Sequence, residues 1–527
     1  MLQSIPLPPM PYLYGFSIHR IQNYLFATNR LREILGASEL VNTICEDFFT
    51  EQCRKLEVTI RPENVLLQAA GNIRCVFEAS ERAALAKLVR QFPRAVENLA
   101  PGLHCSQAVV PIGAHLVEAL QHLDEHLAAQ RNRPRRRSTP GQMIVAKARR
   151  TGGAAVSIDE EEHWVDRITL VKNDQQKQNR IGLFRKLVSG NFTPGRIPWD
   201  IEKIVPREKD SWLAIVHADG NSLGRVIQQI KEKLRGQHDQ LQSALARFST
   251  SLDAATVAAA QTAFQSIATE FKVATYYPLR PVVLGGDDLT LIIRADLALD
   301  FTTQFLRAFE SETQTRFAFL QTDYGLTDLA RGLTACAGIA YAKANFPFHY
   351  SVKLAEDLTK SAKYFSKGLD KKRPPSSLAL FKNQSSFVED LAAMRRRTQC
   401  LPNGESRYDV PAYLANPRDE HWDIQHLVSG MATLDRLRDQ EGRNAISKLH
   451  RYVAAVLADD PDAPTMLERV QKKNTALYEL LQLDRERQDK PATLADSDRQ
   501  GFPLYDLLQL YAFRQKRRKS ILKISTQ

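Results

Sequence analysis

The chain has 527 residues, 43% hydrophobic and 25% charged, with a formal net charge of +12 at pH 7. This length exceeds what one hydrophobic core usually supports, so we expect about three domains. No apolar run reaches the roughly 20 residues of a membrane span, and the N-terminus lacks the pattern of a secretory signal, so we expect a cytoplasmic protein with no membrane partner.

The first 130 residues predict a small α/β unit. The strand YLYGFSI at 12–18 precedes a helix over 21–36, a second helix over 40–49 and the hairpin ENVLLQAAGNIRCVFEA. A helix near 82–92, the strand HCSQAVVPIG and a helix over 115–129 follow. Apolar strands alternating with amphipathic helices in this order are typical of a ferredoxin-like fold. We assign this domain to residues 1–130.

Residues 131–207 differ in composition from the unit before them. They carry the basic stretch PRRRSTPG, the pair Gly152 and Gly153, and an acidic run at 159–162. Such a shift indicates a basic linker with an inserted subdomain, whose function the sequence does not reveal.

Residues 208–388 predict a second α/β unit with the same order of elements. A strand ending in WLAIVHAD, two helices, the hairpin PVVLGGDDLTLIIR, a helix through 301–309, the strand LTACAGIAYA, the helix SVKLAEDLTKSAKYF and the strand SLALF follow one another. The two units match element for element, with AAGNIRCVF standing where LGGDDLTLII stands. We interpret this as a duplication and predict two ferredoxin-like domains, the first without the acidic residues.

The C-terminal part, residues 389–527, reads as helical. Amphipathic stretches lie at 424–437, 445–457, 465–483 and 505–513. We predict a C-terminal helical bundle.

Basic residues gather in three runs along the chain. These runs lie within 131–137, at 395–397 and within 514–519. Each alone is compatible with a solvated surface or a tail, but together with the net charge they favour RNA or a ribonucleoprotein surface as the partner.

The GGDD motif is the first candidate for a functional site. Gly285, Gly286, Asp287 and Asp288 lie between two apolar runs, which predicts a β-hairpin with the acidic pair at its tip. Glycines at such a turn accept positive φ and let a nucleotide approach the backbone closely. Because Asp and Gly are also the commonest turn residues, the motif alone does not distinguish a turn from a site.

Asp219 is the second candidate. It ends the apolar strand WLAIVHA, and Gly220, Asn221, Ser222 and Gly224 follow it directly. Ligands bind at the carboxyl ends of strands and at helix N-termini, where free N–H groups favour phosphate. If this strand neighbours the GGDD hairpin, the three aspartates converge, and carboxylates with substrate phosphates are typical Mg²⁺ ligands. We predict that all three are catalytic metal ligands for phosphoryl transfer, with the four following residues and the GGDD glycines near the nucleotide.

Ordinary explanations compete with these roles. Asp219 and Asn221 are good helix N-cap residues, and only their combination with GGDD favours a metal site. Lys363, on the helix after the strand LTACAGIAYA, could reach a phosphate, although a solvated helix lysine is the simpler interpretation.

A family resemblance rests on these same segments. DGNSLG at 219–224, GGDD, the strand LTACAGIAYA and AEDLTKSAK at 355–363 resemble the cyclase palm of the large signalling subunit of type III CRISPR effector complexes. The segment GFSIHRIQNYLFATNRLREILGASELV is similar to the first, degenerate palm of that family, especially its Cmr-type branch. The resemblance covers residues 1 to about 385.

The resemblance implies a function. We expect two palm domains, polymerisation of ATP into cyclic oligoadenylates when target RNA is bound, and Mg²⁺ or Mn²⁺ held by Asp219, Asp287 and Asp288. It also implies a CRISPR RNA–protein complex with other effector subunits as the partner.

Three departures from the family pattern qualify these expectations. Many members begin with an HD nuclease domain, whereas this sequence starts at the first palm, so we expect no DNase activity. The four-cysteine zinc site common between the palms is missing. Asn221 replaces an acidic residue that often follows the first metal aspartate, which leaves the product open.

Two other functions remain open. One is a GGDD enzyme that makes a cyclic dinucleotide from GTP, which the duplicated palm and the lack of an evident sensory domain disfavour. The other is a non-enzymatic scaffold that binds RNA or partner subunits. Intact GGDD and Asp219 disfavour the scaffold, because the equivalent tip in the first palm has become Gly71-Asn72.

Overall fold

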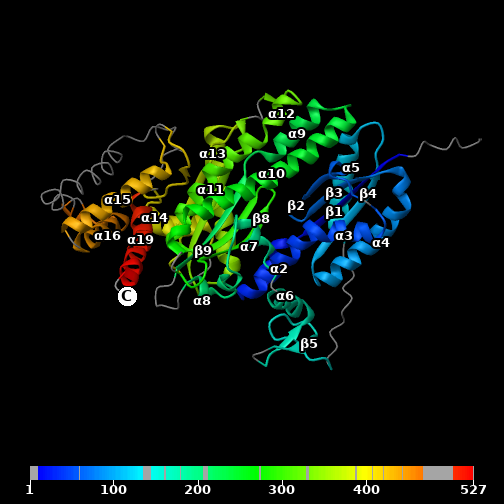
Figure 1. Ribbon diagram of the computed structural model, residues 1–527. Helices are drawn as coiled ribbons and strands as arrows, with labels where there is room; N and C mark the ends of the chain where they lie inside the picture. The colour runs from blue at the N-terminus through cyan, green and yellow to red at the C-terminus, as the bar shows by residue number, and fades with distance from the viewer. Residues whose placement is uncertain are drawn as a thin grey trace, which may run out of the picture.

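Two β-sheets, each covered by helices, form the N-terminal and central parts of the computed structural model (Figure 1). The structure describes residues 10–58, 60–133, 144–159, 162–178, 180–205, 212–271, 274–327, 331–385, 389–405, 407–418, 421–441, 443–463, 465–466 and 503–525. Within these ranges, no helix has both the length and the apolar character needed to cross a membrane.

The first palm is built on a four-stranded antiparallel sheet. β1 (Tyr12–His19) lies between β3 (Asn72–Phe77) and β4 (His104–Pro111), and β2 (Val65–Ala69) pairs with β3 at the edge. The strand order β2-β3-β1-β4 is that of a ferredoxin-like fold, as predicted. Its two longest helices are α4 (Arg82–Leu99) and α5 (Leu116–Arg131), and the short 3₁₀ segments η2 (Pro62–Asn64) and η3 (Ala79–Glu81) lie in its loops.

The predicted limits of the helices at 21–36 and 40–49 are wrong. The structure has α1 (Ile21–Leu25), α2 (Leu31–Thr43), the π-helical segment η1 (Ile44–Phe48) and α3 (Phe49–Lys55). After α1, the Arg30 N–H donates to the Thr28 hydroxyl at 3.1 Å, a local bond that competes with helix. Gly36 does not end a helix, because it is needed where α2 packs on α6 (Arg167–Lys177). A Cβ there would lie 1.9 Å from the Lys172 carbonyl oxygen.

The second palm repeats this strand order and extends it. β7 (Trp212–Gly220) lies between β9 (Asp288–Arg294) and β10 (Ala335–Lys343), with β8 (Leu279–Gly285) at the edge beside β9. The order β8-β9-β7-β10 matches β2-β3-β1-β4, so the duplication predicted from the sequence is present in the topology. On the other side, β11 (Ser377–Lys382) runs parallel to β10, and β12 (Tyr413–Leu414) completes the six-stranded sheet. The helices are α9 (Leu223–Lys233), α10 (His238–Ser266), α11 (Ala295–Arg316), α12 (Ala318–Thr322) and α13 (Phe348–Leu369), with η5 (Ala268–Phe271) after α10.

Close packing of α13 on β10 positions a helix beside the end of β7. Gly338 in β10 has no side chain because a Cβ would lie 2.0 Å from the Ala355 carbonyl oxygen of α13. Thr359 of α13 also donates to the His217 carbonyl oxygen of β7 at 3.0 Å. A larger residue at Gly338 would push the helix away from the sheet, so this contact determines which α13 side chains reach the end of β7.

The segment between the palms begins with a hairpin and α6, which are drawn below the palms in Figure 1. It contains the hairpin β5 (Ala155–Ile158) and β6 (Trp164–Asp166), then α6, α7 (Gly182–Leu187), η4 (Pro194–Arg196) and α8 (Ile201–Ile204). α6 packs on α2, and α7 contacts both α2 and β8, so this segment joins the two palms. The stretch PRRRSTPG lies outside the described residues.

The C-terminal part is helical, as predicted. α15 (Ile424–Glu441), α16 (Arg443–Leu457) and α19 (Leu504–Ser525) pack on one another, and α19 also contacts α11 of the second palm. α14 (Leu391–Gln399) links them to the second palm. Nearly all of the helix predicted at 465–483 lies outside the described residues, and the domain limits at 130, 207 and 388 stay predictions.

The basic run at 395–397 is exposed at Arg396 and Arg397 but not at Arg395. The Arg395 side chain is buried, and its guanidinium lies 3.3 Å from the Asp409 carboxylate. Arg397 pairs with Glu389 at 2.7 Å. These two arginines therefore hold α14 in place.

Candidate metal and nucleotide site

The three predicted aspartates meet at one end of the second-palm sheet. Asp219 is the next-to-last residue of β7 and lies directly opposite Asp288, the first residue of β9, while Asp287 occupies the turn before β9. One carboxylate oxygen from each lies within 4.8 Å of the others. The structure thus brings together the residues that the sequence placed at one site, because β7 and β9 are neighbours.

Crowding and burial perturb two of these acids. Burial, and then the charge of Asp219, raise the pKa of Asp287 to about 7. Burial, followed by Asp287 and Asp219, raises the pKa of Asp288 to about 8. Like charges this close and this far from water favour either a bound proton or a bound cation. Three carboxylates offering oxygen atoms fit Mg²⁺ or Mn²⁺, which prefer such ligands.

Glycines make room for the acidic pair. Gly286 has φ of +63°, a left-handed conformation that favours glycine, and forms the turn of the hairpin with Asp287. A Cβ at Gly220 would lie 3.0 Å from the Cβ of Asp287, so a side chain there would crowd the aspartate. Glycine is therefore required at Gly220 by the nearby aspartate and favoured at Gly286 by the backbone conformation of the turn.

Lys363 belongs to the same cluster. Its Nζ contacts the Asp219 carboxylate and donates to the Gly220 carbonyl oxygen at 2.9 Å. The simpler interpretation of Lys363 as a solvated helix lysine is therefore wrong. In the absence of a metal this ammonium partly balances the negative charge, and it lies where a phosphate bound to the cluster would be within reach.

Residues after Asp219 divide into two groups. The Asn221 side chain is 2% exposed and donates to the Thr334 hydroxyl at 3.0 Å, so it faces the fold and not the site expected for it. Ser222 has φ of +61° and precedes the first residue of α9, and Gly224 lies in the first turn with open space around its Cα. The Arg225 N–H already donates to the Ser222 carbonyl oxygen at 3.0 Å, which leaves the N–H groups of Leu223 and Gly224 at the start of α9 for an anion.

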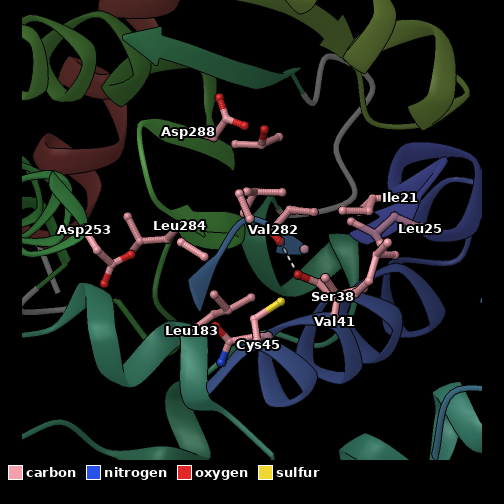
Figure 2. Close-up of a pocket in the computed structure, with 18 of the residues that line it drawn as sticks. Ile21, Leu25, Ser38, Val41, Cys45, Leu183, Asp253, Val282, Leu284 and Asp288 are labelled. Atoms are coloured by element: carbon pink, nitrogen blue, oxygen red, sulfur yellow. Dashed lines mark hydrogen bonds between the residues drawn. The ribbon is translucent and has the colours of Figure 1, made fainter. Parts of the chain in front are cut away.

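A cavity of about 710 Å³ lies between the two palms and reaches the acidic cluster. Figure 2 shows Asp288 and Leu284 on its second-palm side, and Val41 of α2 and Cys45 of η1 on its first-palm side. The Ser38 hydroxyl of α2 donates to the Val282 carbonyl oxygen of β8 and ties the two walls together. Gly285 lines this cavity as well.

Sequence reasoning missed His217 as a cavity residue. Its Nδ1 lies 3.0 Å from the Thr290 hydroxyl, and burial lowers its pKa to about 4. The signal was present in the sequence, because His217 precedes Asp219 by two residues and therefore faces the same side of β7. It is a neutral polar group on the cavity wall near pH 7.

The matching position in the first palm has no carboxylates. There Ser17 of β1 lies opposite Asn72 of β3, as Asp219 lies opposite Asp288, and Gly71 occupies the place of Asp287. The Ser17 hydroxyl donates to the Asn72 side-chain oxygen at 2.7 Å. This cluster is neutral, and among the residues that the structure describes the acidic group able to share a metal ion lies in the second palm.

Residues 212–371 match the family model for the second palm domain of Cas10/Cmr2. The chain carries a Cas10/Cmr2 second palm domain. The matched segment contains the three aspartates and Lys363. No curated protein shows significant sequence similarity to the chain.

Solved Csm1 structures share the Cas10-type fold. The Csm1–Csm4 cassette in complex with cA4 matches with a TM-score of 0.54 at 15% identity, covering 96% of this chain and 70% of that chain. The cassette with AMPPNP gives a TM-score of 0.53 at 14% identity, again with 96% and 70% coverage. The Csm1–Csm4 subcomplex in the type III-A CRISPR-Csm interference complex gives 0.51 at 14%, with the same coverage. The Cmr-type branch stays a prediction.

Proposed function

We propose that this protein is a metal-dependent nucleotidyltransferase that joins ATP into cyclic oligoadenylates as the signalling subunit of a type III CRISPR effector. The observation that carries the proposal is the convergence of three carboxylates, one of which, Asp288, lines the inter-palm cavity. The Cas10/Cmr2 match of the same segment supports it, as do the complexes of Csm1–Csm4 with AMPPNP and cA4.

Asp219, Asp287 and Asp288 would hold Mg²⁺ or Mn²⁺. When bound, such ions supply charge neutralisation at the attacking hydroxyl and at the leaving phosphates. The N-terminus of α9 and Lys363 would bind the triphosphate, because both present N–H donors and positive charge beside Asp219. The cavity walls would hold the nucleosides, with the first palm closing one side.

The reaction that this arrangement suits is an in-line displacement. The ribose 3′-oxygen of one nucleotide bonds to the α-phosphorus of the next, and the bond between the α- and β-phosphates breaks. Pyrophosphate leaves, and the hydroxyl proton passes to water. Closing the ring repeats the step within one oligonucleotide, so no other reactant is required.

The partners belong to the proposal as well. RNA as activator and further effector subunits as partners are supported by the net charge of +12 and by the Csm1–Csm4 likeness. Arg395 is not available to that RNA surface, because it is buried and paired with Asp409, whereas Arg396 and Arg397 are exposed.

The test is pyrophosphate release from ATP with Mn²⁺ by the Asp287→Ala/Asp288→Ala variant. We expect at least about a 100-fold loss, since metal-bound charge stabilisation is worth several kcal/mol. Asp323→Ala, which removes an exposed carboxylate on the same palm, serves as the matched control and should keep its activity. Wild-type turnover in the double variant would refute the proposal.

A further inference from the structure

The turn that carries Asp287 is held from behind by α10. The Gly286 N–H donates to Asp253 Oδ1 at 2.9 Å, and the Thr256 hydroxyl donates to the Gly286 carbonyl oxygen at 2.5 Å. Asp253 and Thr256 are three residues apart and therefore lie on one face of the helix. Thr256 is fully buried, so its bond to the turn is protected from water.

These two hydrogen bonds fix both peptide groups that flank Gly286. The N–H belongs to the peptide before Gly286, and the carbonyl belongs to the peptide that joins it to Asp287. With φ of +63° at Gly286, the two bonds determine the direction in which the chain leaves the turn. The orientation of the next residue, Asp287, depends on that direction.

The first palm supports the same turn from the other side. A Cβ at Gly286 would lie 3.7 Å from the Cβ of Ala70 and 3.8 Å from that of Ala69. The GGDD tip is therefore enclosed between α10 and the β2–β3 tip. A turn enclosed in this way has little freedom once both peptide bonds are held.

We propose that Asp253 and Thr256 are positioning residues, which orient Asp287 and Asp288 for metal binding through the Gly286 backbone. This inference rests on the proposed function. Asp253 stands outside the group of three carboxylates that can share one ion, and it acts by accepting a hydrogen bond. Nothing in the sequence indicates it, because it precedes GGDD by more than 30 residues.

The experiment is Mn²⁺ titration of the full chain by calorimetry, with pairs of variants at each position. Asp253→Ala and Thr256→Val remove the bonds to Gly286, and we expect Mn²⁺ affinity to fall by about 10- to 100-fold, as is typical when support of a metal ligand is lost. Asp253→Asn keeps an oxygen acceptor, and Thr256→Ser keeps the hydroxyl, so each should lie closer to wild type than to its partner variant.

Two results would overturn the inference. Wild-type affinity in Asp253→Ala would show that the turn holds itself, and equal losses in Asp253→Asn and Asp253→Ala would show that the charge matters instead of the bond. If Asp253→Ala fails to fold in a thermal melt, the Thr256→Val and Thr256→Ser pair decides alone. Asp288→Ala separates the two proposals: unchanged Mn²⁺ binding there would refute the metal site itself, whereas its loss with no effect at Asp253 and Thr256 would refute only their positioning role.

Discussion

Three carboxylates within 4.8 Å repel one another strongly where burial limits water. In the folded, metal-free protein this repulsion and burial raise the pKa of Asp287 to about 7 and that of Asp288 to about 8. Unfolded aspartates ionise near pH 4, so between about pH 4 and pH 8 the folded state binds more protons than the unfolded state. Stability of the metal-free protein therefore falls as pH rises through this window.

Binding of Mn²⁺ should oppose this loss of stability at higher pH. We expect Mn²⁺ to raise the melting temperature more at pH 8 than at pH 5.5, because the ion binds ionised carboxylates that otherwise cost stability. In Asp287→Asn/Asp288→Asn the pH dependence in this window should flatten and the Mn²⁺ effect should disappear. Thermal melts in chelator and in Mn²⁺ at both pH values provide the measurement. An equal Mn²⁺ shift at both pH values would contradict the assignment.

Lys363 offers a second test at the residue scale. Lys363→Ala removes the ammonium beside Asp219, and we expect kcat/KM for ATP to fall roughly 10- to 100-fold, since a hydrogen bond to a charged group contributes about 1.5–3 kcal/mol. Lys367→Ala, on the exposed face of the same helix, is the control and should change little. Equal kinetics in the two variants would mean that Lys363 serves only the fold.

Residue types and order were enough to predict the acidic cluster but not its supports. Asp219 and GGDD point to a site only in combination, because each alone has an ordinary explanation as a helix cap or a turn. Asn221 was predicted to belong to the same site, yet its side-chain amide donates to the Thr334 hydroxyl in the interior of the fold. Thr334 is more than 100 residues further along the chain, so the local sequence does not indicate this contact. Asp253 is found only when α10 and the hairpin are brought together.

At the scale of elements, the buried pair between Glu39 of α2 and Arg280 of β8 links the two palms. The groups lie 3.7 Å apart and are 3% and 1% exposed. Burial raises the pKa of Glu39 to about 7 and lowers that of Arg280 to about 10. The pair is therefore costly to separate, although its net contribution to stability can be small.

Replacing one member of this pair should lower the stability of the fold more than replacing both members. Glu39→Leu leaves the Arg280 charge buried and should destabilise the fold by about 3–5 kcal/mol, whereas adding Arg280→Met should restore most of the loss. Denaturant midpoints of the single and double variants measure this difference. Asp323→Asn, which breaks an exposed pair with Arg247, should change the denaturant midpoint little. A double variant no more stable than Glu39→Leu would contradict this account.

Strand elements were predicted better than helix limits, for a physical reason. Alternation and turn residues mark a hairpin locally, so the tips at Gly71 and Gly286 were both found. Gly36 favoured a helix end, but α2 runs through it because α6 packs there at close range. Tertiary packing overrides local propensity at such a position.

At the scale of the molecule, the site is a product of two palms that face each other. Topology and the duplication follow from the sequence, while the cavity of about 710 Å³ depends on how α2, β8 and α7 pack, which no local pattern encodes. The net charge of +12 favoured an RNA surface, yet Arg395, in one of the three basic runs, is buried and paired with Asp409. Global charge indicates a partner class without locating the surface that binds it.

The most direct test of the account is to incubate the purified protein with Mn²⁺ and each labelled nucleoside triphosphate, with and without RNA, and to identify the products by mass spectrometry. We predict oligoadenylate, linear or cyclic, from ATP alone among the four nucleotides, and its loss in the Asp287→Ala/Asp288→Ala variant. A cyclic dinucleotide made from GTP, or adenylate products that persist in the double variant, would contradict it.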